Sequence, residues 1–518
     1  MSVTRCLRRA VRNFPGNPAT IFRDRRQTYA DMTGRVARMA GALQDLGVAP
    51  GDRVAILATN SDRYLELLFA LPWAGAVAVP VNTRFSTDEI RYCLEDSGTS
   101  VLFADAALLG AVEALGGLPP ALATRIMIDA DPAPAGWLAY EDLVAAGRAV
   151  ADADVAEDQL CGIYYTAGTT SRSKGVMLSH RNLCSNAINA VDGLRFTDRS
   201  IYLHSAPMFH LADGTSTFAV TWTGGAHTFV PRFDAHDCLT TIETVGVTNA
   251  QFVPTMIKGL IDACETGKYR PASLRQILYG ASPIPDAHLK RAVELLPGVT
   301  FVHGYGMTET SSIATLLDPR YTTLEGPEAA RRGSCGQAGL LVDVRVVGED
   351  GAELPRGEVG EVVMRGPNIM MGYWNKPAET AQALRDGWMH SGDLGRMDEE
   401  GFLFLVDRLK DMIKTGGENV FSVEVEGAIA AMPEISECAV IGIPDDTWGE
   451  SVHAVVVPRA GASVTEAAVI AHCRSLLTHY KCPKSVEIRT TPLPLSGTGK
   501  ILKRTLRDDW VARNPKSA

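Results

Sequence analysis

The sequence lacks several features that would place it in a specialised class of protein. Its ten cysteines are scattered and form no Cys-x-x-Cys pair, which disfavours both a disulfide framework and a zinc site with standard ligand spacing. Basic residues do not exceed acidic ones, since 50 Lys and Arg stand against 60 Asp and Glu. Nucleic acid is therefore not an expected partner. Unpaired thiols instead favour a reducing, cytoplasmic location.

Long hydrophobic runs, internal repeats and low-complexity segments are also missing. The uncharged run 67–81 is interrupted by Pro72, Gly75 and Pro80, and it is shorter than the ~20 residues that a membrane-spanning helix needs. We predict no transmembrane segment. A hydrophobic fraction of 46% is typical of globular proteins. At 518 residues the chain should form at least two domains, because single cores stop growing near about 250–300 residues.

What the sequence does contain is a long alternation of short apolar runs with amphipathic stretches. The apolar runs expected to be buried strands are 53–58, 76–81, 100–103, 200–204, 248–253, 276–279 and 299–302. Helical stretches such as 29–46 and 286–296 lie between many of them. This alternation predicts α/β layers with mostly parallel strands.

The pattern changes after about residue 335. Closely spaced strands are expected at 341–347, 358–365 and 401–406, which indicates an antiparallel β subdomain. Beyond the charged stretch 407–411, the expected elements are helices 422–431 and 465–477 and strands 437–443, 451–458 and 485–489. We predict a large N-terminal domain of layered α/β subdomains, residues 1–409, and a small C-terminal α+β domain, residues 410–518.

A glycine- and threonine-rich loop, YYTAGTTSRSKG at residues 164–175, is the first candidate site. Small residues let backbone N–H groups and hydroxyls approach phosphate oxygens, and a lysine adds positive charge. The expected phosphate-binding residues are Thr166, Gly168, Thr169, Thr170 and Lys174. A P-loop is excluded because Ser173 and Gly175 stand where it needs Gly and Ser or Thr. Taken alone, the loop is equally consistent with a polar surface turn.

Further short strings follow this loop in a fixed order. They are YGAS at 279–282, GYGMTET at 304–310, SGDL at 391–394, DRLK at 407–410, GGEN at 416–419 and PLSGTGK at 494–500. Together with the loop they resemble the motifs of the adenylate-forming superfamily, in its acyl-CoA synthetase branch. The resemblance spans nearly the whole chain. It implies an enzyme that uses ATP, Mg²⁺ and coenzyme A to convert a carboxylic acid into its acyl-CoA through an acyl-adenylate, releasing AMP and pyrophosphate.

The resemblance also implies roles for individual residues. Tyr305 would stack on adenine, because an aromatic ring is a platform for any base. Glu309 would hold Mg²⁺, with the Thr166 hydroxyl nearby. Asp393 would accept hydrogen bonds from the ribose, beside Arg408, although an ordinary salt bridge explains this pair on spacing alone. The other expected ATP-binding residues are Gly280, Ala281, Ser282, His303, Gly304, Gly306, Thr308, Lys410 and Lys414. The expected coenzyme A-binding residues are Gly416, Gly417 and Glu418.

Lys500 is the predicted catalytic lysine. When the substrate carboxylate attacks the α-phosphorus of ATP, negative charge grows on oxygens that a nearby lysine can neutralise. The resemblance implies that the mobile C-terminal domain then rotates about Lys410 and brings the turn at Gly416 and Gly417 to the adenylate. The phosphate loop departs from the commonest family form at Ala167, Ser171 and Ser173, where Ser, Gly and Pro are usual.

The acid is less well defined by the sequence. Residues 207–210, PMFH, resemble the border of the acyl pocket, and His210 would lie near the carboxylate or would instead be a core histidine. Phe209, Trp222, Val253 and Tyr279 are the expected apolar walls. Gly214 stands where some long-chain enzymes have a bulky aromatic gate. A fatty acid or an aryl acid such as a hydroxycinnamate is expected, and transfer to a carrier-protein phosphopantetheine is the alternative to coenzyme A. A homodimer is a further prediction.

Overall fold

The computed structural model of the chain describes residues 1–130, 132–166, 172–281, 284–495 and 501–514. The chain divides into two compact units. Unit 1 comprises Met1–Val344 and Met364–Met389, and unit 2 comprises Arg345–Val363 and His390–Ala518. This division by compactness assigns residues 390–409 to the same unit as the C-terminal segment. The boundary at Lys410 therefore stays a prediction about where the domains hinge.

Unit 1 contains two large sheets. In the first, the strand order is β16-β15-β14-β13-β12-β10-β11-β1-β2. The strands from β14 to β1 are parallel, and β2, β15 and β16 are antiparallel to their neighbours. The bounds are β1 Pro18–Phe22, β2 Arg25–Thr28, β10 Ile201–His204, β11 Ala226–Phe229, β12 Asn249–Phe252, β13 Gln276–Gly280, β14 Thr300–Tyr305, β15 Thr315–Leu317 and β16 Gln337–Ala338.

The second sheet has the order β19-β9-β8-β4-β3-β5-β6-β7. Its strands from β8 to β7 are parallel, whereas β9 and β19 are antiparallel to their neighbours. The bounds are β3 Arg53–Leu57, β4 Val77–Pro80, β5 Val101–Ala104, β6 Thr124–Met127, β7 Leu138–Ala139, β8 Leu160–Thr166, β9 Lys174–Ser179 and β19 Gly372–Tyr373. The predicted strands of this region are confirmed, with small shifts at their ends.

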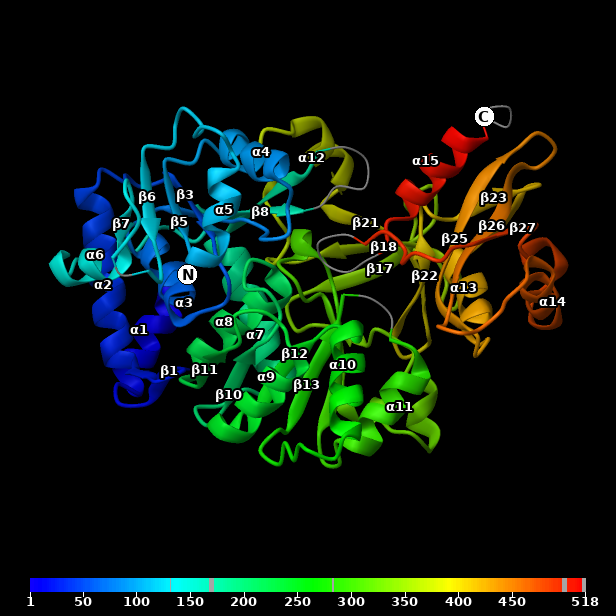
Figure 1. Cartoon of the computed structure of the whole chain (residues 1–518), viewed down its shortest axis with the longest axis horizontal. Coiled ribbons are helices and arrows are strands. Elements are labelled where there is room, and N and C mark those ends of the chain that lie inside the picture. Colours follow the sequence, from blue (N-terminus) through cyan, green and yellow to red (C-terminus); the bar gives the residue numbers. More distant parts are fainter. Residues whose placement is uncertain (131, 167–171, 282–283, 496–500, 515–518) are drawn as a thin grey trace. The chain divides into compact units, whose positions relative to one another are not determined.

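Helices cover both faces of both sheets (Figure 1). One buried cluster joins strands of the two sheets to a shared layer of helices, and these are α1 Thr4–Asn13, α2 Tyr29–Asp45, α3 Asp62–Trp73, α6 Tyr140–Ala146, α7 His180–Leu194 and α8 Leu211–Thr223. The other face of the first sheet packs on α9 Ala235–Thr241, α10 Pro254–Glu265 and α11 Asp286–Leu295. The other face of the second sheet packs on α4 Thr87–Ser97 and α5 Leu109–Glu113.

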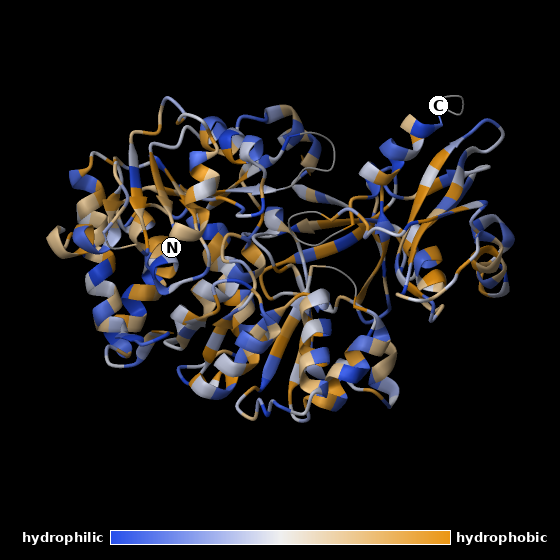
Figure 2. Cartoon of the chain, viewed as in Figure 1, coloured by the Kyte–Doolittle hydropathy of each residue, from blue (hydrophilic) through white to orange (hydrophobic). Residues whose placement is uncertain are grey.

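The alternation of side chains along the strands explains this layering. In β3, Val54 and Ile56 belong to the cluster shared by the two sheets, whereas Ala55 and Leu57 belong to the cluster on the opposite face. Successive strand residues point to opposite faces, so an unbroken apolar run is a strand buried on both sides. Figure 2 shows hydrophobic residues along such strands, while the helices carry both hydrophobic and hydrophilic residues. The predicted α/β fold class is confirmed.

Unit 2 contains the C-terminal α+β structure. Its sheet has the order β24-β23-β26-β25 with β27 beside β26, and its helices are α13 Ser422–Ala430, α14 Glu466–Leu476 and α15 Lys503–Arg513. The strand bounds are β23 Ile413–Thr415, β24 Glu418–Val420, β25 Ile435–Asp445, β26 Gly449–Pro458 and β27 Ser485–Ile488. The predicted elements are confirmed, and α15 was not predicted.

The strands predicted after residue 335 are also present, and the pairs β20–β21 and β21–β22 are antiparallel. They form a sheet in the order β17-β18-β21-β20, with β22 beside β21. The bounds are β17 Asp343–Val347, β18 Gly360–Arg365, β20 Leu384–Arg385, β21 Trp388–Met397 and β22 Leu403–Arg408, and the short helix α12 spans Pro377–Ala383. The division between the two units falls within β17, β18 and β21.

Candidate functional site

The phosphate loop connects β8 to β9. These strands pair antiparallel up to Thr166 and Lys174, which lie opposite each other in the register. The Thr166 hydroxyl donates to the Lys174 carbonyl oxygen at 3.4 Å. The predicted Gly168, Thr169 and Thr170 lie outside the described residues, as do Ala167 and Ser171. At the far end of β9, Ser179 and Asn182 form a capping box that begins α7. Thus the strand that carries Lys174 is fixed at both ends.

Lys174 and Glu309, which are 135 residues apart in the sequence, both contact Tyr373. The Lys174 ammonium lies over the Tyr373 ring, 4.7 Å from its centroid. The Tyr373 hydroxyl donates to Glu309 Oε1 at 2.9 Å. Burial, together with the neighbouring Glu309 carboxylate, raises the pKa of Tyr373, so the hydroxyl remains a donor at neutral pH. The structure thus brings the predicted phosphate lysine and the predicted metal ligand to one side chain that sequence reasoning missed.

The expected adenine-side residues lie at the ends of neighbouring parallel strands. Tyr279 and Gly280 end β13 and pair with His303 and Gly304 of β14. The Tyr279 and His303 rings stack, with centroids 4.8 Å apart and planes inclined by 4°. Ligands of open α/β sheets bind beyond the carboxyl ends of the strands, where these residues lie. The predicted grouping of these motifs is therefore consistent with the topology.

Close approach of two backbones explains the glycine in the first of these motifs. A Cβ atom on Gly280 would lie 2.2 Å from the Gly304 carbonyl oxygen. The next residue, Ala281, has a φ of +67°, a conformation that side-chain-bearing residues rarely adopt. Strain of this kind is common where a chain is shaped around a ligand. The following predicted residue, Ser282, lies outside the described residues.

A hydrogen bond from one of its ring nitrogens fixes the orientation of the His303 ring. Its Nδ1–H donates to the Ser334 carbonyl oxygen at 2.9 Å, and burial lowers the pKa of His303. The ring is therefore neutral at physiological pH. Tyr305, the last residue of β14, is almost buried, with 9% of its surface exposed. Its stacking on adenine stays a prediction.

The loop that carries Thr308 and Glu309 is held by buried amides. A Cβ atom on Gly306 would lie 1.7 Å from the Ser312 carbonyl oxygen, so the chain folds tightly back on itself. Asn186 and Asn368 both donate from Nδ2 to the Thr310 carbonyl oxygen, at 3.2 and 3.0 Å. Sequence reasoning missed these asparagines, because an isolated Asn carries no periodic or motif signal.

The predicted acyl-side residues come from several separate segments of the chain. His210 caps α8, because its Nδ1 accepts a hydrogen bond from the Ala212 amide at 3.1 Å. Capping of α8 is thus a third role for His210, beside the two considered from the sequence. Because Nδ1 accepts this hydrogen bond, Nε2 is the nitrogen that carries a proton. Asn60 was missed, although its side chain accepts from the Met208 amide at 2.8 Å and donates to the His204 and Ala206 carbonyls. Asn60 thus holds the backbone leading to Phe209.

The other predicted pocket walls are more widely spaced. Val253 directly follows β12, whose last residue Phe252 pairs with Tyr279. Trp222 lies near the opposite end of α8 from His210, about 18 Å along the helix axis at 1.5 Å per residue. The two ends of α8 could face the same substrate only if that substrate were long. Membership of Trp222 in the pocket stays a prediction.

In unit 2 the predicted ribose pair is formed. Asp393 of β21 lies opposite Arg408 of β22, and their side chains approach to 3.1 Å. Lys410 and Lys414 are exposed. Gly416 and Gly417 occupy the two-residue turn between β23 and β24 with φ values of +63° and +86°, as a type I′ hairpin requires. Glu418 is exposed beside them, and Trp448, which sequence reasoning missed, packs against Gly416.

The predicted catalytic lysine, Lys500, lies outside the described residues. The described residues on either side of its segment are paired, since Leu495 and Ile501 form an antiparallel bridge. The Leu502 amide also donates to the Pro494 carbonyl oxygen at 2.8 Å. The role of Lys500 stays a prediction.

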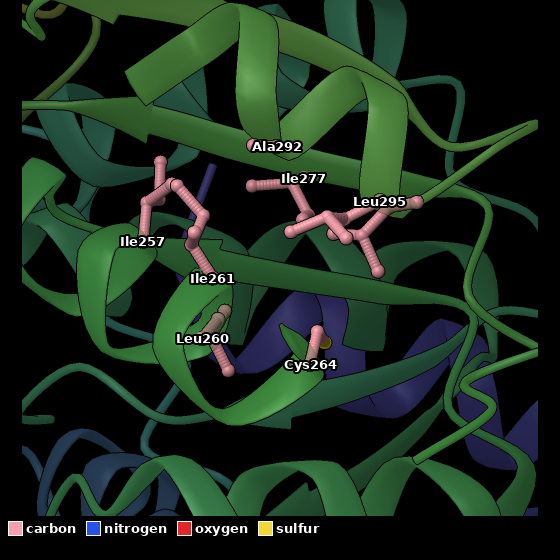
Figure 3. Close-up of a pocket in the computed structure, with 8 residues that line it drawn as sticks. Ile257, Leu260, Ile261, Cys264, Ile277, Ala292 and Leu295 are labelled. Atoms are coloured by element: carbon pink, nitrogen blue, oxygen red, sulfur yellow. The ribbon is translucent and has the colours of Figure 1, made fainter. Parts of the chain in front are cut away.

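A narrow crevice between α10, α11 and β13 is apolar throughout (Figure 3). Its lining residues are Ile257, Leu260, Ile261, Cys264, Ile277, Ala292, Leu295 and Leu296. It contains no charged group to orient a carboxylate, so we assign it to core packing. In the described part of the chain, no three His, Cys, Asp or Glu side chains converge as in a protein-only metal site. None of the described helices combines the length and the hydrophobicity needed to cross a membrane.

Two family descriptions match this chain. "AMP-binding enzyme" matches residues 7–374, and "AMP-binding enzyme C-terminal domain" matches residues 424–500. A feruloyl-CoA synthase of Amycolatopsis sp is 41% identical over 93% of each chain. A long-chain-fatty-acid–CoA ligase of Mycobacterium tuberculosis is 35% identical over 95% of each chain. An indoleacetate–CoA ligase of Aromatoleum aromaticum is 35% identical over 96% of each chain.

Solved structures are similar over the same extent. The o-succinylbenzoate CoA synthetase of Bacillus subtilis, in complex with its acyl-adenylate intermediate, has a TM-score of 0.85 and 29% identity, covering 97% of this chain and 98% of its own. ATP-bound MatB of Rhodopseudomonas palustris has a TM-score of 0.86 and 32% identity, covering 98% and 99%. The similarity is therefore not confined to the nucleotide motifs.

Proposed function

Because this chain belongs to the AMP-binding enzyme family, in its acyl-CoA synthetase branch, we propose that it activates a carboxylic acid with ATP and transfers the acyl group to free coenzyme A. The observation that carries this proposal is the convergence of Lys174 and Glu309 on Tyr373. One positive and one negative group held together in this way suit a polyphosphate and the cation that accompanies it.

The residues present fit Mg²⁺, which the family implies. Glu309 is a hard oxygen donor, and Mg²⁺ is commonly held by one or two carboxylates together with substrate phosphates. The absence of a protein-only metal cluster in the described part of the chain suits this arrangement. Glu309 and the Thr166 hydroxyl would hold the ion. When bound, it would neutralise charge on the phosphates.

In the first half-reaction, a carboxylate oxygen of the substrate attacks the α-phosphorus of ATP. The new oxygen–phosphorus bond gives the acyl-adenylate, and the bond to pyrophosphate breaks. Lys174 would hold the phosphates, and Lys500 would neutralise the charge that grows on the transferring oxygens. His210, whose Nδ1 accepts from the Ala212 amide, would orient the carboxylate through a hydrogen bond from Nε2. No general base is required, because the nucleophile is already ionised.

In the second half-reaction, the thiol sulfur of coenzyme A attacks the acyl carbon and forms the thioester bond. The acyl carbon–oxygen bond breaks, AMP leaves with that oxygen, and the thiol proton passes to solvent. We propose that the C-terminal domain rotates about Lys410. This rotation would remove Lys500 from the adenylate and bring the turn at Gly416 and Gly417 to it. The exposed turn and the half-exposed Trp448 beside it offer a flat surface for the thiol-bearing arm. A boundary at Lys410, with domains 1–409 and 410–518, belongs to this proposal.

We propose a fatty or aryl acid as substrate, with hydroxycinnamates as the first class to test. The names of the relatives support both classes, since one is a feruloyl-CoA synthase and another a long-chain-fatty-acid–CoA ligase. Gly214, one turn into α8, leaves the helix without a bulky gate near His210. We propose a reducing, cytoplasmic location, because the ten cysteines, all in described residues, form no disulfide. A homodimer stays a prediction for light scattering to test.

The test is pyrophosphate release from ATP and Mg²⁺ across fatty, benzoic and cinnamic acids. An active acid should also yield AMP and a thioester when free coenzyme A is added. If a thioester forms only with a phosphopantetheinylated carrier protein, the acyl acceptor is that carrier protein and not free coenzyme A. Nucleotide binding without pyrophosphate release for any acid would overturn the proposed activity.

A further inference from the structure

We propose that Tyr373 is a positioning residue that sets Lys174 and Glu309 for the magnesium–ATP complex. This inference rests on the proposed function. Tyr373 does not itself touch the reacting atoms in this proposal. Its hydroxyl and its ring each hold a different charged side chain, and these two side chains would bind the nucleotide.

The position of Tyr373 is determined by a strand pair. β19 runs antiparallel to β9, with Tyr373 opposite Val176, two residues beyond Lys174. The Tyr373 amide donates to Thr380 Oγ1 at 2.9 Å, and the Trp374 amide donates to the Gly175 carbonyl oxygen at 2.7 Å. The ring is 8% exposed. Backbone bonds on both sides and burial of the ring therefore restrict its motion.

The hydroxyl acts on the orientation of the Glu309 carboxylate. It donates to Oε1, and the same chain segment fixes the Glu309 backbone, because the Met370 amide donates to the Glu309 carbonyl oxygen at 2.8 Å. Both the start and the end of the Glu309 side chain are thus restrained by residues 370–373. Hydrogen bonds that orient a metal-binding carboxylate commonly raise metal affinity tenfold or more.

The ring acts on Lys174 in a different way. The face of an aromatic ring attracts a cation but carries no net charge. It therefore does not neutralise the cation as a carboxylate would. Lys174 contacts the Tyr373 ring in this way, with its ammonium 4.7 Å from the ring centroid. The ammonium is therefore held near the phosphate loop with its positive charge still directed to an anionic ligand. A carboxylate in place of the ring would compete with phosphate.

Two substitutions separate these effects. Tyr373→Phe removes the hydroxyl and keeps the ring, so the affinity for the metal should fall about tenfold while Lys174 stays in place. Tyr373→Leu removes both, so the nucleotide without metal should also bind about threefold more weakly. The matched control is Tyr140→Phe, which removes another buried tyrosine–carboxylate bond, from Tyr140 to Glu66 Oε2 at 2.6 Å.

The measurement is the binding of Mn²⁺, followed by electron paramagnetic resonance, to full-length protein saturated with α,β-methylene ATP, which cannot release pyrophosphate. Titration of the same analogue without metal gives the second affinity. Tyr373→Phe should lose metal affinity while Tyr140→Phe keeps it. Wild-type metal affinity in Tyr373→Phe, or an equal loss in the control, would overturn the inference. Pyrophosphate release by the wild type is measured in parallel, so that failure of the proposed function is recognised separately.

Discussion

The glycines of the two candidate nucleotide-handling regions are needed for different reasons. In unit 1, Gly280 and Gly306 allow two backbones to approach closely, and a Cβ atom would lie within 2.2 Å of a carbonyl oxygen at either position. In unit 2, Gly417 has open space around its Cα but a φ of +86°. The first region is shaped by packing, and the second by the conformation of a turn. The region proposed to bind ATP is thus shaped by close packing, whereas the turn proposed to move to the adenylate is exposed.

One carboxylate from each unit shows a second difference, in how its charge is compensated. In unit 1, partial burial opposes ionisation of Glu141, but hydrogen bonds from Arg35, Arg25 and Arg63 outweigh it and lower its pKa to about 2. In unit 2, Glu426 pairs with Lys503 at 2.7 Å, and burial raises the pKa of Glu426. Three guanidinium groups therefore offset the partial burial of Glu141, whereas the contact with Lys503 does not offset the burial of Glu426.

The largest expected effect separates the two half-reactions. Lys500→Ala should slow acyl-adenylate formation by about 10²–10³-fold, because one charge-stabilising group is lost from the transition state. Thioester formation from supplied acyl-adenylate should be largely spared. Stopped-flow measurement of each half-reaction provides the check. Equal losses in both half-reactions by a folded protein would contradict the assignment of Lys500 to the first step alone.

The next effect tests the contrast between packing and turn conformation. Gly306→Ala forces a Cβ atom against the Ser312 carbonyl, so it should lower the melting temperature and weaken binding of α,β-methylene ATP by at least about tenfold. Gly417→Ala should cost only about 1 kcal/mol of stability and leave binding of the analogue unchanged, because the strain is local to the turn. Calorimetric titration measures the affinity of each variant for the analogue, and thermal denaturation measures its stability. Similar binding losses in both variants would remove the contrast.

The smallest expected effect concerns pH. The pKa of Glu141 in the folded protein is below its ordinary value, so its stabilising contribution is present above about pH 4.5 and is lost as the pH falls toward 2. Glu141→Gln should therefore lower the melting temperature at pH 7, and the difference from the wild type should shrink through this acid range. A difference that is constant from pH 7 to pH 3 would show that the ionised carboxylate is not responsible.

Much of the fold was predictable from local patterns. Strands such as β3 and β13 were found because they are unbroken apolar runs, and helix α2 because its hydrophobic residues recur with a helical period. Helix α15 was missed because its exposed, highly charged sequence has only Leu506 fully buried. The motif residues of the site were found by their order, which is a property of the sequence alone.

The sequence by itself therefore determined the family and the layered α/β architecture, and it supplied the residues proposed to bind ATP, since periodicity and ordered motifs are local signals. Only the tertiary structure decided which of those residues meet. Tyr373 reaches Lys174, 199 residues away, because β19 pairs with β9, and it reaches Glu309 because the same segment holds the Glu309 backbone. Strand pairing between distant segments leaves no periodic trace in the sequence, so such contacts become visible only when the sheet has formed.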